Sequence, residues 1–305
     1  MTQNNRTKEK PIFRKLEDLN LIDNFLFQAM LSQEKDGEEF ARILLSTILG
    51  KHIRKVKIIP QKNILGLDTD KHGIRLDAYI EEVSDELDAN QADVEIIPNI
   101  YDIEPNNSYE KASLPKRIRY YHGLIDTQLL SAGINYDKLP NMIVIVILPY
   151  DPFDQNRMVY TIRNQCIEDP SIPYDDGAQK IFLYTKGTEG NPSQALKDML
   201  KYIEKSTNDN VTNQDIASIS ELVNKVKHKK EVGINYMKSW EIEALARKEA
   251  FADGFSEGTS KGSREMQDKV NQLNLQLAKA GRTEDIIKSA GDKAYQEELF
   301  KKFDL

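Results

Sequence analysis

The sequence predicts an α/β protein with a mixed sheet flanked by helices, followed by a mainly α-helical C-terminal region. Three observations lead to this prediction. Helix-period and strand-period segments alternate along the first two thirds of the chain, residues 142–148 are an uninterrupted apolar run, and the composition turns charged and helix-favouring after residue 215. A continuously apolar strand is typical of a sheet that helices cover on both faces.

The first segments are polar and then helical. We expect residues 1–15 to form a flexible arm. Apolar residues at helical spacing predict a helix over 23–31, with Asp23 as its N-cap, and another over 38–49, which Gly50 ends.

Strand patterns follow these helices. Apolar and charged residues alternate in 53–59 and in 74–80, which predicts two half-buried strands. The stretch 81–95 holds seven acidic residues and no basic ones, and we interpret it as an exposed hairpin tip. A further strand is predicted over 96–104. Pro105 should close it, because proline cannot donate to a strand ladder.

The remaining elements complete an α/β order. They are a crossover helix over 114–132, strands over 142–148, 158–162 and 180–184, and a helix over 193–205. The polar run 206–215 is typical of a linker, so we predict that the first domain spans 16–205.

Residues 216–305 are predicted to form the helical C-terminal region, a candidate oligomerisation segment. Gly254, Gly258 and Gly262 share one helical face there, although glycine costs a helix about 1 kcal/mol relative to alanine. They indicate either close approach of a partner helix or a weakly helical linker, and both interpretations stay open. A short coiled-coil-like seam follows at Val270, Leu273, Leu277 and Ala280. A homodimer through these helices is therefore one expectation.

Composition excludes several function classes. The single cysteine, Cys166, and four scattered histidines cannot supply a zinc site of the usual kind, and no glycine-rich phosphate loop or GxSxG motif is present. No apolar stretch is long enough for a membrane span, so we expect a cytoplasmic protein that does not bind a membrane. The net charge of −7 does not exclude nucleic-acid binding, which depends on local basic patches.

A pair of carboxylates is the sharpest chemical feature. Asp77 lies in one predicted strand and Glu104 ends a neighbouring one. Carboxylates on adjacent strands can hold Mg²⁺ or Mn²⁺, because hard cations prefer oxygen ligands, and such an ion can support phosphodiester hydrolysis. Acidic residues number 49 of 305, so an incidental pair is the structural alternative.

Several linked motifs contain this pair. They lie in order at 74–78, 101–106, 114–121 and 133–139, within a longer match over 23–187. At these residues the chain resembles the PD-(D/E)XK nuclease family transposases, also called recombination-promoting nucleases. The resemblance implies a restriction-endonuclease-like core and metal-dependent DNA cleavage with Mg²⁺ or Mn²⁺. It assigns Asp77 and Glu104 as catalytic metal ligands.

The position two residues after Glu104 departs from this family. Glutamine or lysine usually stands there to orient or activate the attacking water, whereas this chain has Asn106, one methylene shorter than glutamine, after Pro105. We retain Asn106 as the third catalytic position. A cation from Lys111 or Lys116 is a further hypothesis.

Basic residues open the crossover helix. Lys116, Arg117 and Arg119 are predicted to neutralise DNA phosphates, and a solvated helix face is the alternative. The leading interpretation is thus a Mg²⁺-dependent DNA endonuclease, transposase-like and recombination-promoting. A catalytically weakened nuclease-fold protein that binds DNA or a partner is the alternative, which Asn106 favours. A structural oligomeric module with incidental carboxylates is a third possibility.

Overall fold

The computed structural model describes residues 13–60, 63–64, 74–75, 78–83, 98–107, 109, 111–130 and 133–305. The described chain divides into two compact units. We call Ile12–Tyr236 the sheet unit, and Met237–Leu305, the described part of the other, the C-terminal unit. Among the helices of these described ranges, none is long and apolar enough to cross a membrane.

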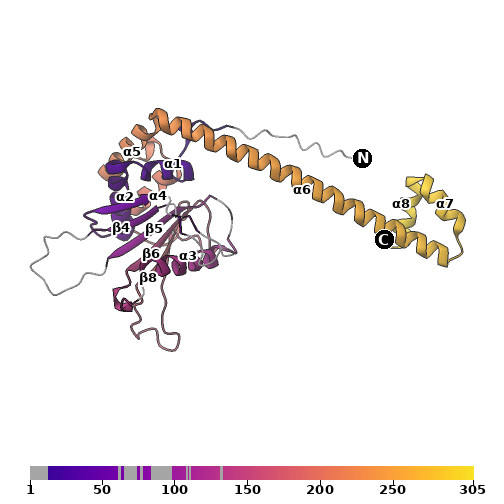
Figure 1. Cartoon of the computed structure of the whole chain (residues 1–305), viewed down its shortest axis with the longest axis horizontal. Helices are drawn as coiled ribbons and strands as arrows, with labels where there is room; N and C mark the ends of the chain where they lie inside the picture. Colours follow the sequence, from indigo (N-terminus) through magenta and orange to yellow (C-terminus); the bar gives the residue numbers. More distant parts are fainter. Residues whose placement is uncertain are drawn as a thin grey trace, which may run out of the picture. The chain divides into compact units, whose positions relative to one another are not determined.

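A mixed sheet forms the centre of the sheet unit (Figure 1). In the described residues it has six strands, in the spatial order β1-β4-β5-β6-β8-β7. The strands are β1 (Val56–Pro60), β4 (Ala78–Glu82), β5 (Asn99–Pro105), β6 (Asn141–Leu148), β7 (Val159–Ile162) and β8 (Ala178–Tyr184). β5, β6 and β8 pair in parallel, whereas the outer neighbours pair antiparallel. Short strands β2 (Asn63–Ile64) and β3 (Ile74–Arg75) form a separate pair. The predicted α/β class with a mixed sheet is confirmed.

One face of the sheet is covered by helices from both ends of the unit (Figure 1). These helices are α1 (Asn24–Leu31), α2 (Glu34–Leu49), α4 (Gln194–Glu204) and α5 (Gln214–Lys227). Their apolar sides share one buried cluster with Tyr101, Ile103 and Ile145 of the strands. Gly50 ends α2 in the left-handed conformation, with φ 63°, as the sequence predicts.

The other face is covered by α3 (Leu114–Leu129), which connects β5 to β6 as the predicted crossover. Leu114 and Ile118 of α3 pack in a second cluster with Val144 and Val146 of β6. Alternate residues of β6 therefore serve two different cores. This explains why the run 142–148 is apolar throughout.

The sheet unit extends beyond the linker predicted at 206–215. The Ser206 hydroxyl accepts a hydrogen bond from the Leu21 N–H (2.9 Å), and the Ser206 N–H donates to Asn20 Oδ1 (2.9 Å). α5 then contributes buried side chains to the core that α1 and α2 share, namely Ile216, Ile219, Val223 and Val226. The compact unit consequently reaches Tyr236 rather than ending near residue 205.

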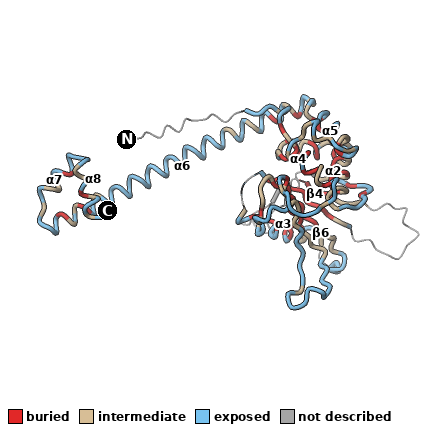
Figure 2. Tube along the Cα trace, turned by 180° about the vertical axis from the view of Figure 1, so that it is seen from behind, coloured by how far each residue is buried: buried red, intermediate tan, exposed pale blue. Residues whose placement is uncertain are grey.

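The C-terminal unit is helical. α6 (Lys230–Lys279) continues into it and is followed by α7 (Thr283–Gly291) and α8 (Lys293–Lys302). Leu273 and Leu277 of α6 pack with Leu299 of α8 in a small core, while most of α6 is exposed (Figure 2). α7 begins at Thr283, and Arg282 stands at its N-cap position.

A buried histidine gives α3 a pH-dependent contribution to stability. His122 is 6% exposed and hydrogen-bonds to the backbone of Gln179 in β8. Burial, followed by the nearby Lys180 ammonium, lowers the pKa of His122 from 6.5 to about 4, although the Gln179 bond and Asp176 oppose this shift. The folded protein therefore keeps His122 neutral where the unfolded chain already binds a proton.

We expect the free energy of unfolding to fall as the pH drops from 6.5 towards 4. Complete titration of His122 would account for about 3 kcal/mol, because one pKa unit corresponds to about 1.4 kcal/mol. Urea denaturation across this pH range measures the effect. His122→Gln should lose part of the acid sensitivity, and a variant with the wild-type pH profile would contradict the assignment.

Candidate functional site

Polar residues occupy alternate positions along β5 and just after it, on the face that α3 covers. Asp102, Glu104 and Asn106 are buried, with Glu104 6% exposed. Side chains alternate along a strand, and Ile100 packs in the α3 cluster whereas Tyr101 and Ile103 do not. The polar residues therefore share the α3 face. Buried carboxyl and amide groups inside an apolar face are a feature of functional sites.

Asn106 stays in this row despite the preceding proline. β5 includes Pro105, and the Asn106 N–H donates to the Ile147 carbonyl of β6 (2.9 Å). Successive N–H groups of a strand point to opposite sides, so the missing donor of Pro105 faces away from β6. The pairing of β5 with β6 continues past the predicted closure at Pro105. It keeps Asn106 on the same face as Glu104.

Asp77 lies outside the described residues. β4 begins at the next residue, Ala78, and runs antiparallel to β5 with Tyr79 opposite Asp102. The beginning of β4 therefore lies beside the end of β5 that carries Glu104. Burial, with a smaller effect of Glu81, raises the pKa of Tyr79, so that this phenol stays protonated opposite Asp102.

The predicted DNA-binding cations lie in the first turns of α3 but face different ways. Arg117 is half-buried and follows Leu114 by three residues, which places it at the border of the face that packs on the sheet. Lys116 and Arg119 are exposed. Arg117 is therefore directed towards the sheet, whereas the other two offer their charge to the solvent.

The loop between β5 and α3 is tied to the loop after β6. Lys111 forms an ion pair with Asp154, and this carboxylate raises the pKa of Lys111. The Tyr109 ring centroid lies 4.9 Å from that of Tyr150, with the planes tilted by 55°. Lys111 would therefore have to leave Asp154 to supply its positive charge to the candidate site.

The loop after β6 is itself fixed by Asp151. Its carboxylate accepts hydrogen bonds from the Phe153 N–H (3.0 Å), the Tyr160 hydroxyl (2.7 Å) and the Asn156 N–H. Burial by itself would raise the pKa of Asp151, but these bonds outweigh it and lower the pKa. The carboxylate therefore stays ionised and holds the loop that carries Tyr150.

The oxygen ligands at the C-terminal end of β5 suit a hard divalent cation. The carboxylate of Glu104 and the amide oxygen of Asn106 are ligands that Mg²⁺ accepts, whereas no thiolate is near in the sequence. In the described part of the chain, no group of three or more His, Cys, Asp and Glu side chains is arranged to hold a metal ion. Comparison with protein-family models, curated proteins and solved structures finds no match for this chain.

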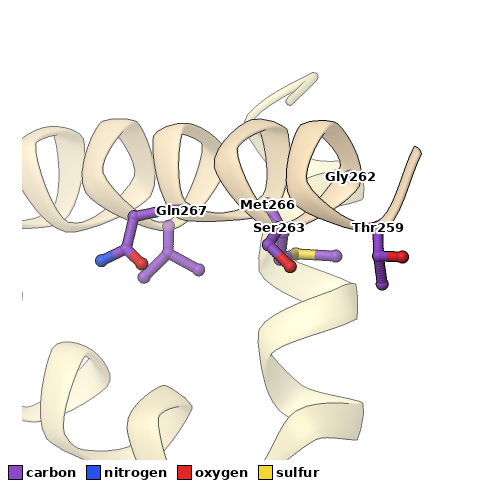
Figure 3. Close-up of a pocket in the computed structure, with 6 residues that line it drawn as sticks. Thr259, Gly262, Ser263, Met266 and Gln267 are labelled. Carbon is purple, nitrogen blue, oxygen red and sulfur yellow. The ribbon is translucent and has the colours of Figure 1, made fainter. Parts of the chain in front are cut away.

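A second candidate surface lies on α6 in the C-terminal unit. A shallow groove there is lined by Thr259, Gly262, Ser263, Met266, Gln267 and Val270. Figure 3 shows the labelled side chains along one side of the helix. Gly262 leaves this side open, since a Cβ added to it would meet nothing within 4 Å. Phe251, Phe255 and Met266 are exposed apolar residues of the same helix.

Proposed function

We propose that the protein is a metal-dependent DNA endonuclease with a restriction-endonuclease-like core, transposase-like and recombination-promoting, that acts in the cytoplasm. The observation that carries the proposal is the buried placement of Glu104 and Asn106 on one face of β5, beside the start of β4. A mixed sheet in which α3 connects β5 to the parallel strand β6 supports the proposed core. The linked motifs from the sequence support the family.

Each residue has a distinct role in this proposal. Asp77 and Glu104 would hold Mg²⁺ or Mn²⁺, which would polarise a phosphoryl oxygen and lower the pKa of a bound water. The Asn106 amide would orient the attacking water by a hydrogen bond. Arg117 would neutralise a phosphate close to the carboxylates, and Lys116 and Arg119 would bind phosphates further along the strand.

Plasmid cleavage tests this proposal. The full chain is incubated at low salt with supercoiled plasmid and Mg²⁺, Mn²⁺ or EDTA. We expect nicked or linear product with either metal and none in EDTA, and no product from Asp77→Ala or Glu104→Ala. Cutting in EDTA, or by both variants, would contradict a nuclease that depends on these carboxylates.

The alternative function is a catalytically weakened nuclease fold that binds DNA or a partner. Asn106 favours it, because its amide reaches one methylene less far than glutamine. This alternative predicts that the wild type binds DNA without cutting it in any metal. It also predicts that Asn106→Gln gains metal-dependent cleavage, which an active wild-type enzyme has already.

We also propose that a second copy of the chain binds along α6. One face of α6 is defined by Phe251, Phe255, Gly258, Gly262, Met266, Val270, Leu273 and Leu277, spaced by three or four residues. The C-terminal end of this face already packs against Leu299, and the exposed part continues it. The glycines allow close approach of a partner helix.

Sedimentation of full-length variants tests the homodimer. We expect a dimer in the wild type and a shift towards monomer in Phe255→Lys and Met266→Lys, because a buried charge opposes association. Ile242→Lys is the matched control, because Ile242 is 70% exposed. At about 100° per residue, it lies about 140° around α6 from Phe255. A monomeric wild type, or equal effects of all three substitutions, would contradict the proposal.

A further inference from the structure

We propose that Tyr109 stacks on an unpaired base, so that the DNA taken by this site contains a single-stranded segment. The inference rests on the proposed nuclease function and specifies its substrate class. Tyr109 lies three residues after Asn106, in the loop that leads from the candidate site to α3. It is 73% exposed although its ring packs against another aromatic side chain, so most of its surface is open to a ligand.

The Tyr109–Tyr150 pair is held in place by both of its loops. The separation of 4.9 Å and the tilt of 55° lie in the range of favourable aromatic pairs. Asp151, next to Tyr150, accepts the hydrogen bonds that fix the loop after β6, and Lys111, close to Tyr109, forms an ion pair with Asp154 of that loop. Tyr109 is therefore positioned before any ligand binds, which reduces the entropy cost of binding.

Basic and aromatic residues that suit a nucleic-acid strand follow Tyr109 in the sequence. Lys116 and Arg119 are exposed in the first turns of α3, and Tyr120 is a second exposed ring. Lys116 and Tyr120 are four residues apart and thus share a face of the helix. Cations that bind phosphates, interleaved with aromatic rings that stack on bases, are the arrangement used by proteins that bind single strands.

The stacking of bases in DNA indicates whether Tyr109 can contact a duplex or a single strand. In a duplex both faces of every internal base are stacked on neighbouring bases, so that an exposed protein ring has no free face to contact. An unpaired base offers such a face, and each stacked base contributes measurably to affinity. A site that used Tyr109 would therefore bind single-stranded, flapped or gapped DNA more tightly than a fully paired duplex.

The test is a binding titration that does not require cleavage. A short single strand carrying 2-aminopurine, whose fluorescence falls on stacking, is titrated with the full chain in EDTA. We expect Tyr109→Ala to weaken binding about five- to hundredfold and to abolish the fluorescence change, whereas Tyr109→Phe and Tyr109→Trp stay near the wild type. Tyr136→Ala is the control, because Tyr136 is 83% exposed and lies before β6 rather than after β5.

A blunt, fully paired duplex gives the second arm. We expect its affinity to be lower and to change less than about twofold in Tyr109→Ala. Unchanged single-strand binding in Tyr109→Ala, or equal losses for both DNA forms, would overturn the inference even if plasmid is still cut. Conversely, Tyr109-dependent binding without cleavage in any metal would support the inference and refute the nuclease function.

Discussion

Replacing Glu104 by glutamine should abolish divalent-metal binding and lower plasmid cleavage by about a hundredfold or more, while the fold persists. Glutamine has nearly the same volume, so the buried position stays filled. Glutamine lacks the negative charge that a hard cation requires. Even the mutation of a residue that only hydrogen-bonds to a metal ligand lowers metal affinity by about 10- to 100-fold. Mn²⁺ titration calorimetry, cleavage rates and thermal unfolding measure the three parts of this prediction.

Glu82→Gln is the matched control at the other end of β4. The Glu82 carboxylate accepts hydrogen bonds from the Tyr101 hydroxyl (2.6 Å) and the Asn99 amide (2.8 Å) and pairs with Lys51 (3.1 Å). Burial would raise the pKa of Glu82, but these partners outweigh it and lower the pKa. We expect this variant to lose about 1–3 kcal/mol of stability and to keep metal binding and cleavage.

The opposite pattern would refute the assignment of Glu104. A Glu104→Gln protein that binds Mn²⁺ and cuts plasmid like the wild type would show that this carboxylate is incidental. Equal loss of metal binding in Glu82→Gln would show that the effect comes from a general disturbance of β4 and β5.

Elements with one strong local signal are predictable from the sequence. The run 142–148 is apolar at every position because β6 contributes to the cores on both sides of the sheet. α2 begins four residues earlier than predicted, at Glu34, but its end at Gly50 follows from glycine's tolerance of a positive φ. Both signals are visible in residues that are adjacent in the sequence.

Polar residues are harder to assign because their partners lie elsewhere. Asp23 is predicted as an N-cap, and it does precede α1, but its carboxylate instead binds the Arg14 guanidinium (2.9 Å) and the Asn20 N–H (2.7 Å). In the predicted linker, Asn213 caps α5 by accepting a hydrogen bond from the Ile216 N–H (2.9 Å). Linkers and helix caps use the same residue types, so composition cannot separate them.

In the candidate site too, some residues can be predicted from the sequence and others cannot. Glu104 and Asn106 stand out through their linked motifs, and alternation along β5 places both on the α3 face. Asp102 has no signal of its own, because its burial follows only once α3 is known to cover that face. Tyr109 escapes prediction since its partner Tyr150 belongs to a loop that follows a different strand.

Removing α5 should unfold the sheet unit. A chain that ends after residue 205 lacks Ile216, Ile219, Val223 and Val226, which pack with α1 and α2. Burying each such side chain contributes about 1.5–3 kcal/mol, so their combined loss is comparable to the whole stability of about 5–15 kcal/mol of a typical protein. We expect the shortened chain to aggregate or to show no cooperative unfolding transition.

A chain that ends after residue 238 is the matched control for this truncation. It keeps α5 and Tyr236, whose hydroxyl donates to the Arg14 carbonyl (2.7 Å) and whose ring lies 4.9 Å from that of Phe25. It should unfold cooperatively. In the full chain, Ile219→Ala should cost about 2–5 kcal/mol, whereas exposed Glu221→Ala should change stability by less than about 0.5 kcal/mol. Cooperative unfolding of the chain ending at 205 would instead show that α5 is dispensable for the core and that the domain ends where the polar run begins.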